Sequence, residues 1–305
     1  MKNTKSKPLV LVVLGPTATG KSDIAVEIAK QFSGEVISAD SRQVYKGMDL
    51  GSGKITKKEM AGIPHYLLDV VSPKTSFSVA KYKKLAEEKI EEIISKNKLP
   101  IICGGTGFYI DSIVKNILLP EVKPDSKLRK ELEEKNLDKL FEILKKLDPA
   151  RAKNIDSKNK VRLIRAIEIA KTLGNIPAVK ELPSKYNFLI IGLDFDDKTL
   201  KERISLRLQK RIKAGMIKEV ENLHKSGVSW KRLESFGLEY RNVALLLQNK
   251  ITLVQMTQNL EREIWQFVKR QRTWFKRNKR IIWLNPVNGK NIIKAQNILK
   301  KYLRA

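Results

Sequence analysis

A glycine-rich segment of eight residues limits the fold of this 305-residue chain more than any other feature. It directly follows the apolar run 9–14 and precedes an amphipathic stretch over 23–32, so the order predicts strand, loop and helix. Glycines at both ends let the backbone curl until its N–H groups and the next helix N-terminus converge on phosphate oxygens. We therefore expect these residues to bind phosphate: Gly15, Pro16, Thr17, Ala18, Thr19, Gly20, Lys21 and Ser22.

The last two residues of the loop carry the polar side chains that phosphate chemistry uses. Lys21 adds a point charge, and the Ser22 hydroxyl is a ligand for Mg²⁺, the cofactor that we expect. Cys103 is the single cysteine of the sequence, which excludes an intramolecular disulfide and a multi-cysteine zinc site. A lone thiol also fits a reducing compartment, so we expect a cytoplasmic protein.

The charge balance of the chain indicates a polyanionic partner. The sequence has 61 Lys and Arg against 33 Asp and Glu, a net charge of +28, which creates a field that collects polyanions such as RNA or DNA. The alternative is a lysine-rich composition whose charge is spread over solvated helix faces. No stretch approaches the length of a membrane span, so we expect no membrane partner.

Further apolar runs predict the remaining strands of a sheet. They occupy 35–38, 99–103, 188–193 and 281–284, and amphipathic helical patterns separate them. This alternation predicts an α/β fold: a kinase-like core with a phosphate loop, whose mostly parallel sheet is flanked by helices. Ligands of such folds bind beyond the carboxyl ends of the strands, where the phosphate loop is also expected.

The domain organisation follows from where strand patterns stop. Between residues 120 and 183 they disappear, and short helical patterns rich in Lys, Glu, Leu and Ile replace them. We expect the core to begin over 1–119, a helical insertion over 120–185, and completion of the core over 186–305. The last part includes a long helical stretch from 198 to about 275.

Three aspartates follow apolar runs and compete for the role of a general base or magnesium ligand. Asp40 follows residues 35–39, beside the phosphate loop, while Asp69 and Asp194 have similar settings. Spacing does not rank them, and each has the alternative of being a helix cap or turn residue. The glycine turn 104–107 is expected at the same sheet edge and offers the Thr106 hydroxyl.

Basic residues are patterned in two places. Arg203, Arg207 and Arg211 recur every four residues, so they line one helix face, which is either a phosphate clamp or a solvated basic face. Near the C-terminus, Trp265, Trp274 and Phe275 alternate with cations. We expect these aromatic residues to be partly core and the following cations to face RNA: Lys269, Arg270, Arg272, Lys276, Arg277, Lys279 and Arg280.

Four motifs together resemble the tRNA dimethylallyltransferases. They occur in the order of that family at 15–22, 37–49, 104–109 and 269–275, and the similarity spans nearly the whole chain. The resemblance implies transfer of a dimethylallyl group from dimethylallyl diphosphate to N6 of adenosine 37, beside the anticodon, in tRNAs that read codons beginning with U. The loop would then bind a leaving diphosphate, whose oxygens resemble the β,γ end of ATP.

The resemblance also implies roles for individual residues. Asp40 would be the base that takes the N6 proton, and Thr106 and Arg207 would be catalytic, with Arg203 close behind as a second candidate for the diphosphate. The partners would be dimethylallyl diphosphate and the anticodon stem-loop of tRNA, bound by a monomer. The implied tRNA contacts are Asp40, Ser41, Arg42, Gln43, Thr106, Arg129, Val161, Arg162, Leu163, Ile164 and Arg165.

Two segments depart from the family pattern, and one other function uses the same loop. The segments 155–159 and 236–240 differ from the usual turns of the family. The alternative function is a nucleotide or small-metabolite kinase, in which the loop binds ATP and the arginine helix serves as a lid. A kinase has no need of so large an excess of positive charge, so the sequence favours the transferase.

Overall fold

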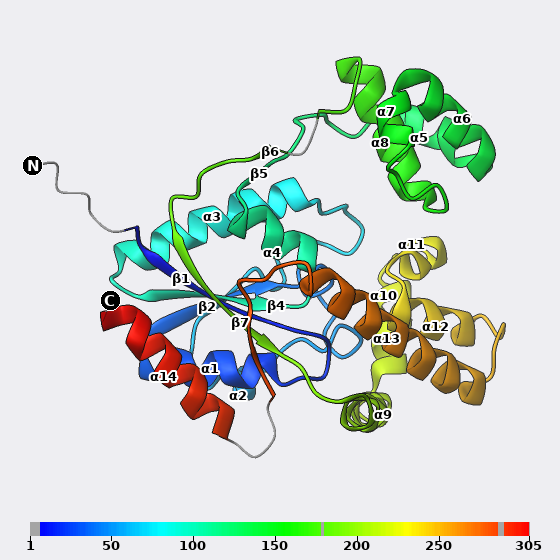
Figure 1. Cartoon of the computed structure of the whole chain (residues 1–305). Helices are drawn as coiled ribbons and strands as arrows, with labels where there is room; N and C mark the ends of the chain where they lie inside the picture. The colour runs from blue at the N-terminus through cyan, green and yellow to red at the C-terminus, as the bar shows by residue number, and fades with distance from the viewer. Residues whose placement is uncertain (1–6, 178–179, 286–289, 305) are drawn as a thin grey trace, which may run out of the picture. The chain divides into compact units, whose positions relative to one another are not determined.

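The computed structural model describes residues 7–177, 180–285 and 290–304, and it divides into two compact units (Figure 1). The larger unit consists of Met1–Lys115 and Pro183–Ala305, and the smaller one of Asn116–Leu182. The smaller unit begins and ends a few residues earlier than the helical insertion predicted over 120–185. In the described part of the chain, no helix is both long and apolar enough to cross a membrane.

A parallel sheet forms the centre of the larger unit. Within the described residues it has six strands in the order β3-β2-β4-β1-β7-β8. The strands are β1 (Leu9–Leu14), β2 (Gly34–Ala39), β3 (His65–Tyr66), β4 (Leu99–Gly104), β7 (Asn187–Leu193) and β8 (Ile282–Leu284). All the predicted strands are confirmed. The prediction missed β3, because two half-buried residues give no periodic pattern.

Helices cover both faces of this sheet. On one face, α3 (Val79–Ser95) and α4 (Gly107–Val114) pack their buried residues against Val10, Val12 and Ile102. On the other face, α1 (Lys21–Gln31) and α14 (Lys290–Arg304) pack against Leu11 and Val13. Figure 1 shows the two pairs on opposite sides of the strands. Successive residues of β1 therefore enter different cores, as strand geometry requires.

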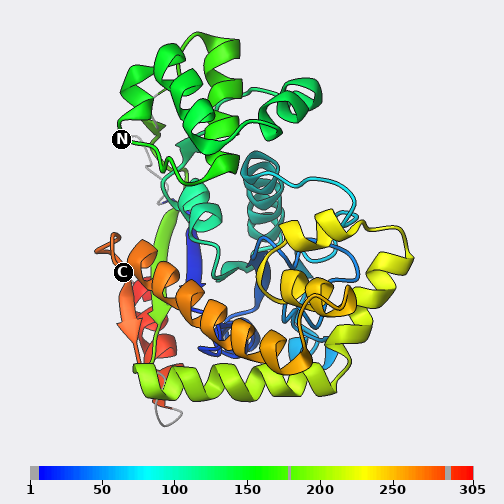
Figure 2. The same ribbon diagram turned by 90° about the vertical axis from the view of Figure 1, so that its right-hand side faces the viewer.

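The predicted helical stretch 198–275 is a series of helices with a core of its own. They are α9 (Asp197–Lys213), α10 (Met216–Lys225), α11 (Trp230–Ser235), α12 (Leu238–Leu247) and α13 (Leu253–Phe275). Buried side chains such as Leu200, Met216 and Leu260 join them. Figure 2 shows α9 in yellow-green and α13 in orange, which pack against each other. The side-chain hydroxyl of Thr252 and the side chain of Gln255 form a capping box that starts α13.

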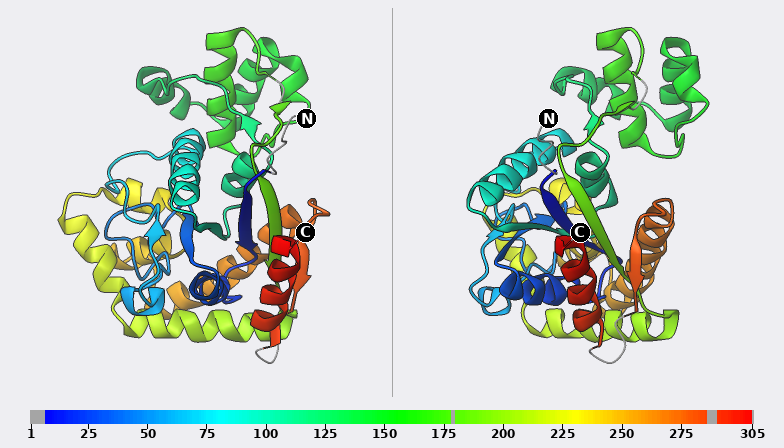
Figure 3. Two further views of the ribbon diagram at one scale, coloured as in Figure 1. Left: turned by 90° about the vertical axis from the view of Figure 1, so that its left-hand side faces the viewer. Right: turned by 60° about the vertical axis from the view of Figure 1, so that its left-hand side comes forward.

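The smaller unit is a helical bundle on a short ribbon, drawn in green in Figure 3. Its helices are α5 (Ser126–Glu133), α6 (Leu137–Leu147), α7 (Pro149–Ala152) and α8 (Lys160–Leu173). The antiparallel strands β5 (Ile117–Leu118) and β6 (Lys180–Glu181) form the ribbon. Neither strand was predicted, because two residues are too few to show a periodic pattern. A core that includes Leu132, Leu144 and Ile167 holds the helices together. The remaining helix, α2 (Lys57–Met60), belongs to the larger unit.

Candidate active site

The glycine-rich loop lies between β1 and α1, as predicted. Gly20 has a φ of 80°, and a Cβ at Gly15 would overlap the carbonyl of Leu193, so both positions favour glycine. The Thr19 hydroxyl donates to the Pro16 carbonyl over 2.9 Å, and Lys21 Nζ donates to the same oxygen over 2.6 Å. These contacts close the turn around the start of α1, where backbone N–H groups favour an anion.

A cleft of about 900 Å³ contains the loop and the side chains that follow β2 and β4. Asp40 Oδ1 accepts the backbone N–H groups of Arg42 and Gln43, over 2.8 and 3.3 Å. Thr106 Oγ1 accepts the N–H of Ser41 over 3.0 Å, which ties the loop after β2 to the glycine turn after β4. Asp40, Thr106 and Lys21 all line the cleft, so a candidate base and a phosphate site share one cavity.

The three aspartates that follow strands differ in their position relative to the cleft. Their spacing in the sequence did not show which of them is the best candidate for the general base. Asp194 accepts Arg272 Nε over 2.9 Å, and Asp69 forms an ion pair with Lys54 over 2.5 Å. Neither of these two carboxylates lines the cleft, whereas Asp40 does. A general base must lie within hydrogen-bond reach of the proton that it removes, so it has to line the cavity that holds the substrate. Asp40 is therefore the candidate base.

The arginine stripe on α9 faces the phosphate loop. Arg203 Nε donates to the Ala18 carbonyl over 2.7 Å, and Arg207 contacts the Thr17 hydroxyl over 3.5 Å and the Gly53 carbonyl over 3.2 Å. Arg211 forms an ion pair with Glu239 over 3.1 Å, in which both side chains are nearly buried. Arg203 is exposed, whereas Arg207 and Arg211 are half-buried, so the stripe is only partly a solvated basic face, and its contacts with the loop are compatible with a phosphate clamp.

Burial shifts the pKa values of the cations around the loop. It lowers the pKa of Lys21 to about 8, and it lowers the pKa of Arg207 to about 10, with a further contribution from the nearby charge of Arg211. Burial also raises the pKa of the Cys103 thiol to about 11, so this neighbour of Lys21 stays neutral. An anion in the cleft would relieve the unfavourable burial of these positive charges, which is the electrostatic signature of an anion site.

Gln271 is a residue of the site that sequence analysis quoted in a motif but gave no role. Its Oε1 accepts the N–H of Thr17 and its Nε2 donates to the Gly105 carbonyl, each over 2.9 Å. The buried side chain thus joins the phosphate loop to the second glycine turn. A signal was present, because Gln271 takes a place in the apolar stripe of α13 between Val268 and Phe275, where an amide needs polar partners.

Comparison with known proteins decides the family. Residues 43–278 match the family described as IPP transferase. The chain belongs to this family. A tRNA dimethylallyltransferase of Acetivibrio thermocellus is 40% identical over 303 residues, which cover 96% of this chain and 97% of that protein. A tRNA dimethylallyltransferase of Treponema denticola is 45% identical over 272 residues, or 88% of this chain and 91% of that protein.

A solved structure agrees with this membership. The tRNA isopentenylpyrophosphate transferase of Bacillus halodurans is 35% identical, and it superposes with a TM-score of 0.75 over 98% of this chain and 97% of its own. The expected fold, a kinase-like core with a mostly parallel sheet, is therefore confirmed. Membership of the IPP transferase family also disfavours the kinase alternative, although both classes would use the same loop.

The tRNA contacts expected on the larger unit surround Asp40. Arg42 Nε donates to the Phe236 carbonyl over 2.8 Å, and its guanidinium lies 5.8 Å from the centre of the Phe236 ring. Gln43 Oε1 accepts the Ser38 hydroxyl over 3.1 Å, and Gln43 Nε2 donates to the Gly53 carbonyl over 3.3 Å. Ser41, Arg42 and Gln43 thus line the cleft in fixed positions.

The segment 236–240, which was expected to differ from the usual turn of the family, contacts several residues around the cleft. The Phe236 carbonyl accepts a hydrogen bond from Arg42, and the Glu239 carboxylate forms an ion pair with Arg211. Tyr240 is buried, and its hydroxyl donates to Glu219 over 2.9 Å. This segment therefore anchors Arg42, Arg211 and Glu219 around the cleft.

The contacts expected on the smaller unit need correction. The side chains of Leu163 and Ile164 are buried in its core, so they are not surface contacts. Arg129 donates to both oxygens of the buried Glu168 over 2.7 Å each, and Arg165 adds a bond of 3.1 Å to the same carboxylate. Val161 and Arg162 are exposed at the start of α8 and keep the expected accessibility.

The aromatic residues near the C-terminus are partly core, as expected. Phe275 is buried, and Trp274 Nε1 donates to Asp111 over 3.1 Å. Trp265 packs against the helical core. Arg272 differs from the prediction, because Asp194 and Asp197 hold its guanidinium instead of leaving it to face RNA. The other expected cations are exposed: Lys269, Arg270, Lys276, Arg277, Lys279 and Arg280.

The residues beside the loop fit a magnesium ion only in combination with substrate oxygens. Ser22, Asp23 and Asp40 line the cleft and offer one hydroxyl and two carboxylates, the hard oxygen donors that Mg²⁺ prefers. Among the residues that the structure describes, no group of three or more His, Cys, Asp or Glu side chains could hold a metal. Mg²⁺ commonly binds through one or two side chains, water and substrate phosphates, and this donor set suits that mode.

Proposed function

We propose that this protein transfers the dimethylallyl group of dimethylallyl diphosphate to N6 of adenosine 37 in tRNAs that read codons beginning with U. The products are N6-dimethylallyladenosine and diphosphate. The observation that carries the proposal is that Asp40 shares a cleft with the phosphate loop and the arginines of α9. The names of the relatives at 40% and 45% identity support the choice of reaction.

The donor half of the site stabilises a leaving diphosphate. The C–O bond between the allyl group and the diphosphate breaks, and the negative charge that develops on the leaving oxygens meets Lys21, Arg207 and the N–H groups of the loop. Burial around Lys21 and Arg207 leaves these charges poorly hydrated, so they gain more from an anion than exposed cations do. Mg²⁺ on Ser22 would neutralise further charge on the diphosphate.

The acceptor half supplies a base. The lone pair of the adenine amine is delocalised into the ring, so N6 attacks the allylic carbon only as a base removes its proton. Asp40 takes that proton while the new C–N bond forms. The adenosine leaves the stack of the anticodon loop to enter the cleft, where Thr106 and residues 41–43 position it. We place Arg207 on the diphosphate ahead of Arg203, because Arg207 is the less exposed of the two and its guanidinium lies beside the Thr17 hydroxyl.

We further propose that the protein acts as a cytoplasmic monomer and that the smaller unit contacts tRNA. Val161 and Arg162, exposed at the start of α8, are the residues on which that contact depends. Light scattering of the purified protein measures the oligomeric state. Arg162→Glu is expected to weaken tRNA binding without changing diphosphate binding, and equal tRNA affinity of this variant would contradict the role of the smaller unit.

The test is incubation of purified protein with Mg²⁺, dimethylallyl diphosphate and an anticodon stem-loop, followed by mass spectrometry of the RNA. The expected result is the addition of one five-carbon unit to a single adenosine. AMP as acceptor serves as the comparison, since its prenylation in preference to the stem-loop would assign a free nucleotide as substrate. Consumption of ATP with formation of a phosphorylated product, and no reaction of the diphosphate, would assign a kinase.

A further inference from the structure

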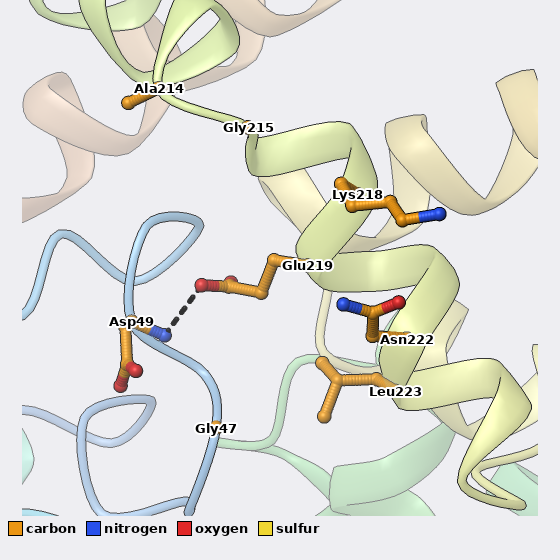
Figure 4. A pocket seen from close by; sticks show the side chains of 8 residues that line it. All are labelled: Gly47, Asp49, Ala214, Gly215, Lys218, Glu219, Asn222 and Leu223. Atoms are coloured by element: carbon orange, nitrogen blue, oxygen red, sulfur yellow. Dashed lines mark hydrogen bonds between the residues drawn. The ribbon is translucent and has the colours of Figure 1, made fainter.

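Glu219 of α10 binds the loop that follows Tyr45 without lining the cleft. Its carboxylate accepts the N–H groups of Asp49, Leu50 and Gly51 over 3.0, 2.6 and 3.0 Å. Figure 4 shows the Glu219 side chain extending from the helix toward the backbone at Asp49. Hydrogen bonds to a charged acceptor are roughly twice as strong as neutral ones, so the carboxylate holds this turn firmly.

Tyr240 of α12 fixes the other side of the carboxylate. Its hydroxyl donates to Glu219 Oε1 over 2.9 Å, and a Cβ at Gly51 would lie 2.6 Å from the ring. Burial, with the charge of Glu219 as a further cause, raises the pKa of Tyr240 well above its ordinary value. The hydroxyl therefore stays protonated and remains a donor to Glu219.

The turn that Glu219 holds leads to the carbonyl of Gly53, which does line the cleft. That oxygen accepts Arg207 Nη2 over 3.2 Å and Gln43 Nε2 over 3.3 Å. Gly53 has a φ of 60°, and a Cβ there would overlap the Arg211 guanidinium. The same Cβ would lie 2.6 Å from Arg207 Nη2, so the Arg207 guanidinium packs directly against the backbone of Gly53.

A second anchor limits how far the turn can move. Lys54 Nζ forms ion pairs of 2.5 Å with Asp49 and Asp69 and donates to the Tyr45 carbonyl over 3.1 Å. Lys54 holds the end of the turn, and Glu219 holds its beginning. With Lys54 in place, loss of Glu219 would loosen residues 49–53 without releasing the whole loop.

We propose that Glu219 is a positioning residue of the diphosphate site, which holds the turn 49–53 so that the Gly53 carbonyl keeps Arg207 directed at the phosphate loop. The inference rests on the proposed role of Arg207. Without the carboxylate, three N–H groups lose their acceptor and the turn samples more positions. Arg207 then has to be ordered when diphosphate binds, and this ordering lowers the affinity.

The test measures binding of inorganic diphosphate with Mg²⁺ to the full chain by calorimetry. Glu219→Gln is expected to weaken diphosphate binding about tenfold. The amide keeps the shape of the side chain but has no negative charge, and its own NH₂ group faces backbone N–H groups of the turn 49–51, which need an acceptor. Glu221→Gln is the matched control, since Glu221 is two residues away on α10 and pairs with Lys218 and Lys225 at the surface. Equal diphosphate affinity of the Glu219→Gln variant and the control would overturn the proposal.

A double variant separates action through Arg207 from a general structural effect. In an Arg207→Ala background, Glu219→Gln is expected to change diphosphate affinity less than twofold, because the residue through which it acts is gone. A second full tenfold loss would show independent effects and overturn the proposal. If Glu219→Gln does not fold, Tyr240→Phe removes one bond to the carboxylate and is expected to weaken diphosphate binding by two- to threefold, again only when Arg207 is present.

The readouts also separate this inference from the proposed function. Binding of diphosphate does not require transfer, so an inactive wild-type protein would refute the transferase while the coupling of Glu219 to Arg207 could still be measured. Affinity for the stem-loop is expected to fall less than diphosphate affinity in Glu219→Gln, because Gln43, which also contacts the Gly53 carbonyl, is held independently by the Ser38 hydroxyl. Equal losses of RNA and diphosphate affinity would indicate general loosening of the protein and overturn the positioning role.

Discussion

At the scale of single residues, Asp40 combines a structural and a chemical task. One of its oxygens accepts the N–H groups of Arg42 and Gln43, which shapes the turn, and the proposed proton transfer needs its negative charge. Asp40→Asn keeps a carbonyl oxygen for the turn but cannot take up the proton. We expect single-turnover transfer to fall by about 10²–10⁴-fold with tRNA affinity unchanged. Normal turnover by this variant would remove Asp40 from the role of base.

Lys21 gives the site a pH dependence. With a pKa of about 8 in the free protein, Lys21 loses its charge as the pH rises above 8, whereas bound diphosphate favours the charged form. Calorimetry is therefore expected to show affinity for diphosphate falling by up to about tenfold per pH unit above 8, with proton uptake on binding. The variant Lys21→Arg keeps its charge, so a fall of the same slope in that variant would contradict the assignment.

The lowered pKa of Lys21 also makes folding stability depend on pH, in the opposite direction to diphosphate affinity. Because the pKa of Lys21 in the folded protein lies below its ordinary value of 10.5, the unfolded chain binds more protons between about pH 8 and that value. Folding stability from this residue therefore rises with pH through that window, while diphosphate affinity falls. The cost of burying the charge is present in full below pH 8.

At the scale of elements, α13 stabilises the site through one amide. The Gln271 amide bonds to the Thr17 N–H and to the Gly105 carbonyl, which belong to separate turns. Both backbone groups would lose this hydrogen bond in Gln271→Leu. We expect the free energy of unfolding to decrease by about 1–3 kcal/mol, measured by denaturant titration, together with weaker diphosphate binding. Thr273→Ala, an exposed change two residues away on the same helix, serves as the control. Equal stability of Gln271→Leu and this control would contradict the role of the amide.

At the scale of the whole molecule, the charge of +28 predicts how RNA binding depends on salt. Neutralising several phosphates releases counterions, so the logarithm of the affinity should fall linearly with the logarithm of the salt concentration. We expect Lys276→Gln, in the exposed basic segment after α13, to reduce this slope by about one unit. Lys30→Gln on α1, where Lys30 pairs with Glu27, is the control and should leave the slope nearly unchanged. A flat salt profile of the wild-type protein would assign the charge to compositional bias.

The amino-acid sequence by itself determined the core strands, the phosphate loop and the helical nature of the stretch after residue 197. Apolar periodicity, glycine spacing and capping residues are local properties, so they can be interpreted without knowing the contacts. They also placed Asp40 at the expected sheet edge and the three arginines on one helix face, although they could not rank Asp40 against Asp69 and Asp194.

Only the tertiary structure decided which groups meet. Gln271 reaches a loop 254 positions earlier in the chain, and Glu219 reaches a turn about 170 positions earlier. It also assigned Leu163 and Ile164 to a core and Arg272 to an ion pair. Contacts between distant segments depend on how strands and helices pack, and this packing leaves no periodic signal in either segment. The side chains that contact the phosphate loop from distant segments could therefore be identified only from the tertiary structure.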